Sequence, residues 1–587
     1  MTRAALIRTA ALGAAALLSV VGGWIFLGFS AKGGVSPIDV LRTVLVGLSG
    51  FWLVWGGAAG IIGLFVPHRP PAFDERQVPR GLTAVLVPIY NEDPLVTFAR
   101  VAAMNRSLRA LGIHQRFHFA ILSDTTALDV AAMEAVWFQH LVSEPDSDGR
   151  IFYRRREHNT GKKAGNVEDF VVSSGGAYDY MLILDADSLM EGATMGAMAR
   201  RMDAEPRLGL LQTLPRIINA RSFFGRAMQF SAAYLSPAFS RGAAVLQGNE
   251  GPYWGHNAIV RVAAFAANCG LPVLSGKPPY GGHILSHDYV EAALLARGGW
   301  HVHLDPFLGG SFEEGPENLV EYAKRDRRWC QGNLQHRRLM FAPKLRLWSR
   351  FVFLQGIMAY LASPLWLVLM GASILSAMLP ERSFPRVPAL FREGVLSLAV
   401  GVALLLVLPK VLILLRGMFD GQNRQFGGTL RAAGSVLLEI VFSTLLAPIL
   451  LMLQSRAVMQ VLLGLDGGWP ATRRAENRLD LRDAFANSWW IVVIGAVTLA
   501  ATILLAPGIA VWVAPAMLPA IFAPLLISLS SRVAPAGRTP WYFRTPPEQA
   551  PSAVILEHRR VITAWTTQGP LEPIIVLEPA QRAAIHA

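Results

Sequence analysis

Two uncharged stretches near the beginning of the chain are long enough to cross a membrane. One runs from Thr9 to Ala31 and the other from Thr43 to Pro67. Each exceeds the ~20 residues that an α-helix needs to span the hydrocarbon core of a bilayer. A signal peptide is an alternative for the first stretch, but its length and the second stretch directly after it favour an uncleaved pair of membrane helices.

Apolar character returns in the second half of the chain and predicts further membrane helices. The stretches are Phe351–Pro380, about Val395–Leu415, about Ala432–Leu453 and Ala484–Ser531. The last is interrupted by Pro507-Gly508 and is long enough for a hairpin of two spans. The region around Pro448 is either one span or a broken hairpin. Because only an even total keeps both ends of the chain on one side, we expect eight spans.

Arginines beside these stretches predict their orientation, since Lys and Arg concentrate on the cytosolic side of membrane helices. They are Arg3, Arg8, Arg69, Arg76, Arg80, Arg532 and Arg538. Both ends of the chain and its middle region are therefore expected in the cytosol. The proline-rich segment after Pro540 is expected to be loosely ordered.

The middle region, from about Gly81 to Lys344, has a different pattern. Short apolar runs, Thr83–Val87, His118–Leu122 and Tyr180–Leu184, alternate with polar segments compatible with helices. This pattern predicts an α/β domain with a mostly parallel sheet, inserted between the membrane helices. We expect four parts: membrane helices in 1–80, a cytosolic domain in 81–345, further membrane helices with interfacial segments in 346–535, and a cytosolic tail in 536–587.

Composition agrees with a membrane protein: 52% of the residues are hydrophobic, 16% are charged and the mean hydropathy is +0.37. The net charge of +13 does not require nucleic acid, because basic residues flank the membrane segments. The two cysteines, Cys269 and Cys330, have no CxxC spacing, which argues against a zinc site or a disulfide framework.

Asp185-Ala-Asp187 directly follows an apolar strand and is the strongest local signal in the sequence. Ligands of open α/β sheets bind at the carboxyl ends of the strands. Two carboxylates at this place favour Mg²⁺ or Mn²⁺, which prefer oxygen ligands and keep coordination positions open for substrate oxygens. Asp185 and Asp187 are therefore predicted to bind a metal ion that also bridges a diphosphate.

Three further segments predict the binding site of that diphosphate compound. Pro88-Ile-Tyr90-Asn-Glu92 closes the first apolar run and Asp124 closes the second, both suited to a nucleoside. For each, a helix-capping turn is the structural alternative. Lys163 lies where a glycine-containing segment, Arg154–Asn166, opens a helix, and a cation there suits a diphosphate.

The remaining candidates predict an acceptor site with a general base. Asp288 is the candidate base for an acceptor hydroxyl, and a helix N-cap is the alternative. Arg328 and Trp329 suit a diphosphate and a sugar face, although arginines here could equally lie at the lipid surface. Tyr253-Trp254-Gly-His256 offers aromatic faces beside hydrogen-bonding groups, as sugar sites do.

The order of these motifs over residues 81–340 resembles the processive family-two glycosyltransferases, which include cellulose and hyaluronan synthases. The segments Arg154–Asn166, Ser286–Ala292 and Arg325–Asn333 are most similar to one branch, the glucans biosynthesis glucosyltransferase H family. The resemblance implies UDP-glucose as donor, a divalent metal, inversion at the sugar, and a β-1,2-linked periplasmic glucan that crosses the bacterial inner membrane. It also implies an acyl carrier protein as a possible partner.

Two departures from the cellulose-synthase pattern limit the transfer of linkage and acceptor geometry. Ser286-His287-Asp288 replaces Thr-Glu-Asp, and Arg325 stands in place of the Gln of Gln-x-x-Arg-Trp. Alternative functions are another processive polysaccharide synthase or transfer of a single sugar to a lipid carrier. A transporter is a third reading, disfavoured because its predicted spans contain few central charges beyond Lys410 and Glu439.

Overall fold

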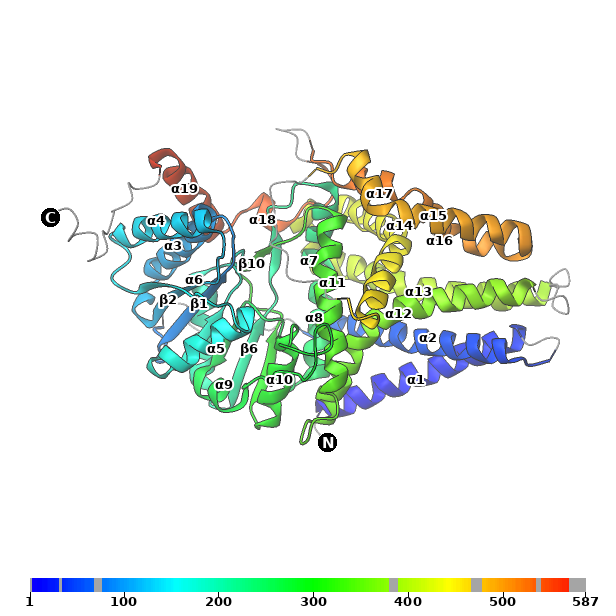
Figure 1. Cartoon of the computed structure of the whole chain (residues 1–587), viewed down its shortest axis with the longest axis horizontal. Helices are drawn as coiled ribbons and strands as arrows, with labels where there is room; N and C mark the ends of the chain where they lie inside the picture. The colour runs from blue at the N-terminus through cyan, green and yellow to red at the C-terminus, as the bar shows by residue number, and fades with distance from the viewer. Residues whose placement is uncertain are drawn as a thin grey trace. The chain divides into compact units, whose positions relative to one another are not determined.

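The computed structural model describes residues 3–30, 34–67, 77–378, 389–465, 478–534 and 540–569 (Figure 1). Arg69, Arg76 and Arg538, used above for orientation, lie outside these ranges. The chain divides into two compact units. Unit 1 comprises Met1–Ala72 and Glu205–Pro551, and unit 2 comprises Phe73–Ala204 and Ser552–Ala587.

Unit 2 holds the predicted parallel strands. They are β1 (Thr83–Ile89), β2 (Phe117–Ser123), β3 (Ile151–Arg155) and β4 (Tyr180–Ile183), in the spatial order β3-β2-β1-β4. All three pairings are parallel, so the strand ends reach one edge together. The helices of this unit are α3 (Pro94–Ala110), α4 (Leu128–Ser143), α5 (Lys162–Ser174), α6 (Gly192–Ala204) and α19 (Ala553–Gln568). The three predicted runs therefore form strands as expected.

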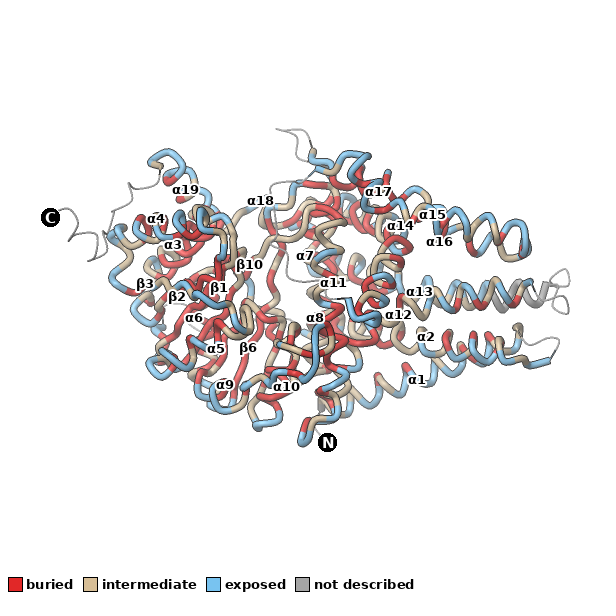
Figure 2. The backbone as a smooth tube through the Cα atoms, in the orientation of Figure 1, coloured by how far each residue is buried: buried red, intermediate tan, exposed pale blue. Residues whose placement is uncertain are grey.

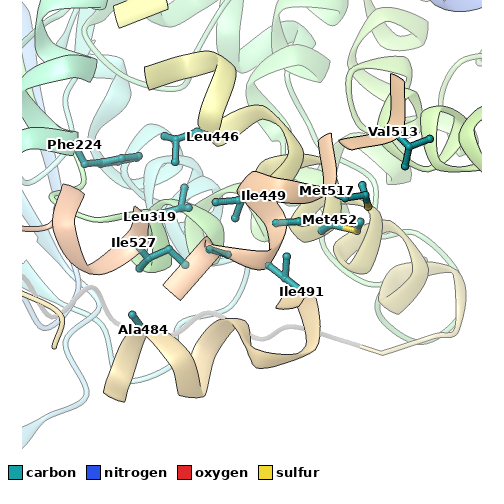
Figure 3. Close-up of a cluster of buried hydrophobic side chains, with 12 residues drawn as sticks. Phe224, Leu319, Leu446, Ile449, Met452, Ala484, Ile491, Val513, Met517 and Ile527 are labelled. Carbon is teal, nitrogen blue, oxygen red and sulfur yellow. The ribbon is translucent and has the colours of Figure 1, made fainter. Parts of the chain in front are cut away.

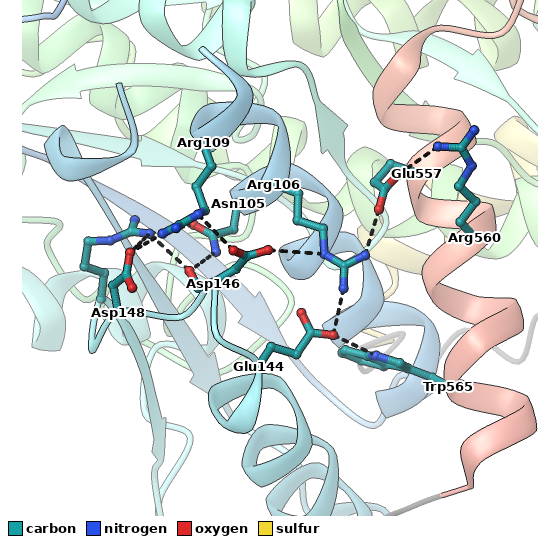
Figure 4. Close-up of polar contacts among 10 residues, drawn as sticks. Asn105, Arg106, Arg109, Glu144, Asp146, Asp148, Glu557, Arg560 and Trp565 are labelled. Atoms are coloured by element: carbon teal, nitrogen blue, oxygen red, sulfur yellow. Dashed lines mark hydrogen bonds and ion pairs between the residues drawn. The ribbon is translucent and has the colours of Figure 1, made fainter. Parts of the chain in front are cut away.

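The C-terminal helix α19 is part of unit 2 and packs against α3 (Figure 4). Arg106 of α3 bonds both Glu557 of α19, at 2.7 Å, and Glu144 at the end of α4, at 2.9 Å. Trp565 stacks on Trp137, with 5.5 Å between ring centroids. The expectation of a loosely ordered segment after Pro540 is thus wrong for the described part, because α19 buries one face on this unit.

Unit 1 contributes the strands β6 to β10 and the helices around them. β8 (Ala258–Arg261) pairs antiparallel with β6 (Leu208–Thr213), and β6 pairs parallel with β9 (His301–Asp305). β7 (Arg216–Ile218) and β10 (Ser311–Glu314) form a parallel pair. The helices are α7 (Phe223–Tyr234), α8 (Ser236–Gln247), α9 (Val262–Asn268), α10 (His287–Arg297) and α11 (Leu319–Gln335). The fold is therefore an α/β domain with a mostly parallel sheet.

The long apolar helices also belong to unit 1. They are α1 (Arg3–Ser30), α2 (Pro37–Leu64), α12 (Leu347–Met378), α13 (Ala389–Phe419), α14 (Thr429–Leu462), α15 (Leu481–Leu505) and the pair α16 (Ala510–Ile521) and α17 (Ala523–Ser530), which bends by 53°. α1, α2 and α13 pack side by side, and much of their surface is exposed or half-buried (Figure 2). Such apolar exposure is what lipid would cover, and the chain is a membrane protein.

The N-terminal membrane helices approach the α/β part of unit 1 closely at small residues. A Cβ atom at Gly63 of α2 would lie 1.7 Å from the carbonyl oxygen of Ala238 in α8. A Cβ atom at Gly242 of α8 would lie 1.8 Å from the carbonyl oxygen of Ala59 in α2. Glycine at both positions permits backbone contact between the two helices, as small residues do in membrane helix pairs.

Helix α14, like α2 and α12, contacts helices of the α/β part. It is one helix through Pro448, so the hairpin considered for this segment is wrong. Just before α14, Asn423 accepts a hydrogen bond from Tyr234 of α7, and near its end Gln460 accepts one from Arg327 of α11. Both ends therefore meet helices of the α/β part, and in Figure 1 α14 runs across the direction of α13.

The middle of α14 has the same kind of surroundings (Figure 3). Leu446, Ile449 and Met452 pack in one buried cluster with Phe224 of α7 and Leu319 of α11, together with residues of α15–α17. Protein therefore covers this face of α14, while other apolar side chains of the helix remain exposed. Its apolar composition alone does not show which face is covered by protein.

The pair α16–α17 returns the chain to the start of α15. The backbone amide of Leu479 donates to Ser531 Oγ at 2.9 Å, and Ser528 Oγ donates to the carbonyl of Leu479 at 3.0 Å. The expected hairpin broken at Pro507-Gly508 is therefore present. Among the described residues six helices, or seven with the bent pair, are long and apolar enough to span a membrane, which corrects the expected eight.

Candidate active site

In unit 2, polar loops follow β1, β2 and β4 at the same edge of the sheet. The backbone amide of Asp124 donates to the carbonyl of Ile89 at 2.9 Å, and that of Leu184 donates to Leu86 at 3.0 Å. These bonds continue the parallel ladder and align the three strand ends. The predicted donor-binding segments, Pro88–Glu92 and Asp124, and the predicted metal site are thus brought together as the strand pattern indicated.

Asp124 is buried and its carboxylate is held by an arginine and an amide. Arg156 binds it in a bidentate manner, with distances of 2.7 and 2.8 Å, and Asn166 Nδ2 donates to it at 2.8 Å. Asn159 Nδ2 also donates to the Asp124 carbonyl at 2.6 Å. Arg156 was not among the predicted site residues, although it lies in the cationic segment that the sequence singled out.

The first donor loop is joined to the second by Asn91. This residue has a positive φ of 58°, and its side-chain oxygen accepts from the backbone amides of Thr126 and Ala127 at 3.1 and 3.0 Å. The Glu92 carboxylate turns back to accept from the backbone amide of Tyr90. Asp93 is the N-cap of α3, as the structural alternative proposed. Tyr90 and Glu92 remain half-buried at the sheet edge.

A buried glutamate that the sequence reasoning missed supports the Asp124 loop. Glu134 of α4 accepts hydrogen bonds from Ser123 Oγ at 2.7 Å and Tyr153 Oη at 2.8 Å, and also from Thr125 Oγ1. Burial, and then the nearby Glu134 charge, raise the pKa of Tyr153, so its hydroxyl remains a donor. The only sequence signal was a carboxylate inside an otherwise apolar helical stretch.

Asp185 and Asp187 lie on a tight turn after β4. The backbone amide of Asp185 donates to Ser188 Oγ at 3.0 Å, and Lys163 forms an ion pair with the Asp185 carboxylate. Arg100 of α3 donates to the carbonyl of Ala186 at 2.9 Å, and this hydrogen bond fixes the turn to α3. The predicted Lys163 and Asp185 are therefore in direct contact.

The two carboxylates on this turn fit a divalent ion that takes its other ligands from a bound substrate. In the part of the chain that the structure describes, no group of three His, Cys, Asp or Glu side chains could hold a metal ion. Two half-buried carboxylates supply only part of an octahedral shell, which leaves positions for diphosphate oxygens and water.

In unit 1, Asp288 lies in the first turn of α10. Ser286 is the N-cap of that helix, so Asp288 is not the capping residue that the alternative proposed. Burial raises the pKa of the Asp288 carboxyl, while the neighbouring His287 and backbone amides lower it. His287 Nδ1 lies 3.0 Å from Glu291 Oε1, one turn further along the helix. A raised pKa suits a carboxylate that must accept a proton.

The predicted aromatic loop lies beside this carboxylate. A Cβ atom at Gly255, whose φ is 86°, would lie 3.7 Å from Asp288 Oδ2. Gln212, which the sequence reasoning missed, holds the loop by accepting from the Trp254 amide and donating to the His256 carbonyl, both at 3.0 Å. His256 lies 3.5 Å from Glu313.

Tyr253 requires a correction within this loop. Its side chain is only 1% exposed, so the ring offers no face on which a sugar could stack. We therefore assign Tyr253 to the support of the loop, and only the half-buried Trp254 and His256 keep access to an acceptor. An aromatic side chain in a polar motif is compatible with either role, and only its burial distinguishes them.

The acceptor motif lies on α11, which packs against the segment before α10. His336, just after α11, donates from Nε2 to the Ser286 carbonyl at 3.0 Å, and Gln335 accepts from the Leu285 amide at 3.0 Å. Burial lowers the pKa of His336 to about 4, so its ring is neutral at physiological pH. Trp329 is 43% exposed, and the Arg325 guanidinium lies 4.5 Å from its ring centroid.

The candidate residues thus form two groups. The donor loops, Lys163 and the two metal-binding candidates belong to unit 2, and Asp288, Trp254, His256, Arg328 and Trp329 belong to unit 1. The two cysteines of unit 1, Cys269 and Cys330, are free thiols and are buried.

Comparison with known sequences identifies two overlapping family profiles. Residues 84–268 match the profile described as glycosyl transferase family 2, and residues 180–415 match glycosyl transferase family group 2. The second match extends beyond the α/β part into the apolar helices α12 and α13. These matches agree with the resemblance found in the motifs.

Curated relatives match almost the whole chain. Glucans biosynthesis glucosyltransferase H of Cereibacter sphaeroides is 51% identical over 552 residues, covering 92% of this chain and 92% of that protein. The protein of the same name from Rhodopseudomonas palustris is 40% identical over 522 residues, covering 87% and 71%. Among solved structures, a mannosyltransferase from Pyrobaculum calidifontis in complex with GDP-Man and Mn²⁺ matches with a TM-score of 0.42 and 15% identity, covering 65% of this chain and 99% of that one.

Proposed function

This chain belongs to the glucans biosynthesis glucosyltransferase H family of glucan-synthesising glycosyltransferases, and we propose that it polymerises glucose from UDP-glucose with inversion. The proposed product is a β-1,2-linked glucan backbone that passes across the inner membrane into the periplasm. The observation that supports a polymerase best is the grouping of Asp288, the Trp254–His256 loop and the end of α11. A base, aromatic faces and an arginine-tryptophan pair are what an acceptor sugar requires.

The donor is proposed to bind at the carboxyl edge of β1, β2 and β4. Tyr90 and Glu92 would contact the base and ribose of UDP, with Pro88 in β1 supporting their loop. Asp124, positioned by Arg156 and Asn166, would accept from the nucleoside with its remaining lone pairs. Lys163 and Arg328 are cations that would bind the diphosphate, since guanidinium and ammonium groups favour phosphate oxygens.

Asp185 and Asp187 are the residues proposed to hold Mg²⁺ or Mn²⁺. Lys163 now pairs with Asp185, so donor binding would exchange part of that ion pair for contacts with the diphosphate. When bound, the ion would supply positive charge at the departing UDP. The turn fixed by Arg100 and Ser188 keeps both carboxylates at the strand end, so no loop needs to be ordered at that moment.

The transfer itself would be a single displacement. Asp288 takes the proton of an acceptor hydroxyl, and the hydroxyl oxygen forms a bond to the anomeric carbon of glucose. The bond from that carbon to the diphosphate breaks, and its electron pair leaves with UDP. The raised pKa of Asp288 brings the carboxylate closer in basicity to the hydroxyl than an exposed aspartate would be.

The proposed orientation places the α/β part in the cytosol. We propose that α14, although long and apolar enough to span a membrane, lies along its surface; α1, α2, α12, α13, α15 and the bent pair α16–α17 then give an even number of crossings. α19 packs within unit 2, so the C-terminal helix lies on the same side as the donor loops. This arrangement agrees with the cytosolic Arg8, Arg80 and Arg532.

Linkage analysis of product made from labelled UDP-glucose by purified protein with Mg²⁺ tests the proposal. We expect a β-1,2-linked polymer, and Asp288→Asn should reduce its formation by at least about 100-fold, the usual lower contribution of a general base. A product of one transferred glucose, or equal synthesis by Asp288→Asn, would refute the polymerase or the base assignment respectively.

The family resemblance also supports an acyl carrier protein as a partner. Copurification of the full-length protein from its native membrane tests this: acyl carrier protein at a fixed ratio supports it, and its absence at any salt concentration counts against it.

A further inference from the structure

Helix α11 has a carboxylate in the middle of its buried face. Asp326 is 7% exposed, and both of its oxygens have partners on helices of the membrane region. Tyr360 of α12 donates to Oδ1 at 3.1 Å, and Gln454 of α14 donates to Oδ2 at 3.1 Å. Gln454 in turn accepts from Ser363 of α12 at 2.7 Å. One side chain thus joins three helices.

The rest of this face is mostly apolar, with the buried Asn333 beside Gly356 of α12. Cys330 and Leu334, one and two turns after Asp326, pack in a buried cluster with Ile357 of α12 and Val458 of α14. Apolar surfaces attract without strong directional preference, so such a face alone permits neighbouring registers. A buried polar residue that must find its partners selects one register, as a single buried polar residue does in coiled coils.

The acceptor motif lies on an adjoining, more exposed part of the same helix, because residues three apart lie only about 60° apart around a helix axis. Trp329 follows Asp326 by three residues, is 43% exposed and is covered by the Arg325 guanidinium. Arg327 secures the helix to the end of α14, bonding Gln460 at 2.7 Å and the Leu465 carbonyl at 2.8 Å. A slip of α11 by one turn would move Trp329 by about 5.4 Å along the helix axis, the pitch of an α-helix.

We propose that Asp326 is a positioning residue that sets the register of α11 against α12 and α14, and thereby holds Arg328 and Trp329 where the growing glucan leaves the base for the membrane helices. This inference rests on the proposed function. It concerns how the enzyme retains the end of the growing glucan between additions of glucose, and not how it binds the donor.

A register role makes a prediction that a purely stabilising role does not. Asp326→Leu leaves the Tyr360 hydroxyl and the Gln454 amide as buried donors without this acceptor, so it should lower the melting temperature. A purely stabilising role predicts product of wild-type length from the folded variant, whereas a register role predicts a shorter product. Loss of positioning worth about 1.4 kcal/mol would shorten the mean product roughly tenfold.

The test uses full-length wild type, Asp326→Leu and a matched control, Asp420→Leu. Asp420 is an exposed carboxylate just after α13 that lies 3.4 Å from Arg416 and accepts from the backbone amide of Gln422 at 3.0 Å. Melting temperature, KM for UDP-glucose, rate of UDP release and product length are measured for each. We expect a shorter product from Asp326→Leu with an unchanged KM for UDP-glucose, and wild-type product length from Asp420→Leu.

Folded Asp326→Leu with product of wild-type length would overturn the proposal, as would equal shortening by Asp420→Leu. If Asp326→Leu does not fold, Tyr360→Phe and Gln454→Leu decide instead, because each removes one of the two hydrogen bonds to Asp326. A shorter product from both variants supports the register role. Product of wild-type length from both refutes it. A wild-type protein that releases no UDP from UDP-glucose refutes the proposed function separately.

Discussion

The acidic side chains of this protein differ in how their charge is compensated, and that difference separates their roles. Asp124 has a bidentate arginine, Glu134 has three hydroxyl donors and Asp326 joins two neutral donors on other helices. A carboxylate so fully engaged is suited to fixing its surroundings. Asp288, whose pKa burial raises, is suited to exchanging a proton.

The pH dependence of catalysis follows from that shift. A general base must be ionised, so activity should fall as the pH drops through the pKa of Asp288, which lies above that of an exposed aspartate. His287 lowers this pKa, so His287→Gln should move the acid limb of kcat/KM for the acceptor to higher pH. Rate profiles of both proteins measure this. An acid limb that stays in place or moves to lower pH would contradict the assignment of Asp288.

Glu134 should influence the donor and not the acceptor. In Glu134→Gln one acceptor oxygen becomes a donor, so at least one of the hydroxyls on Ser123, Thr125 and Tyr153 loses its partner. A lost buried hydrogen bond costs ~1–3 kcal/mol, and we expect KM for UDP-glucose to rise about tenfold. Asp129→Asn, on the exposed first turn of the same helix, is the control. Equal KM values in all three proteins would exclude this role.

At the scale of elements, close backbone contacts decide which helices can pack. α2 and α8 meet at Gly63 and Gly242, where an added methyl group would overlap a backbone carbonyl of the other helix. The overlap is with backbone, which cannot rotate away as a side chain can. These two helices join a membrane span to the α/β part of unit 1, so their separation affects both.

Gly242→Ala should therefore destabilise the folded protein although alanine favours helix formation. We expect a loss of about 3 kcal/mol, typical of overpacking without room for adjustment, seen as a lower melting temperature in detergent. Gly13→Ala in α1 is the matched control, since nothing lies within 4 Å of its added Cβ atom. There the change should be neutral or stabilising. Similar melting temperatures for the two variants would show that the α2–α8 contact relaxes.

At the scale of the whole molecule, the described apolar helices form an even number of crossings in two ways: α14 lies on the surface and the bent pair α16–α17 crosses, or α14 crosses and the pair is re-entrant. One face of α14 packs along α7 and α11, and its Glu439 forms an ion pair with Lys410 of α13 at 2.6 Å. The charges that the sequence analysis noted at these two positions thus neutralise one another. They give no sign of an ion-transport pathway.

Cysteine labelling tests this topology directly, because both native cysteines are buried. Phe419 and Leu463 flank α14 and are 90% and 71% exposed, whereas Leu504, between α15 and α16, is 79% exposed. In inside-out vesicles a membrane-impermeant maleimide should label Phe419→Cys and Leu463→Cys but not Leu504→Cys. In right-side-out vesicles the pattern should reverse. Labelling of Phe419→Cys and Leu463→Cys from opposite sides would mean that α14 crosses the membrane.

Local patterns in the sequence determined much of this protein. Strand runs from Thr83, His118 and Tyr180 formed the expected parallel strands, since continuous apolar residues between helices are a local signal. The membrane character and the hairpin at Pro507-Gly508 also followed from hydropathy, and the order of motifs identified the family. The roles of Asp288, Asp185 and Asp187 remain predictions, with positions that favour them.

Only the tertiary structure decided which partner each side chain has. Hydropathy cannot show which face of an apolar helix protein covers, so it did not predict that α14 continues through Pro448 and packs against α7 and α11. A motif cannot show which face of a residue is buried, so Tyr253 was assigned to a sugar site. Arg156, Glu134 and Asp326 acquire their roles from residues distant in the sequence, because burial and hydrogen bonding depend on what folding brings together.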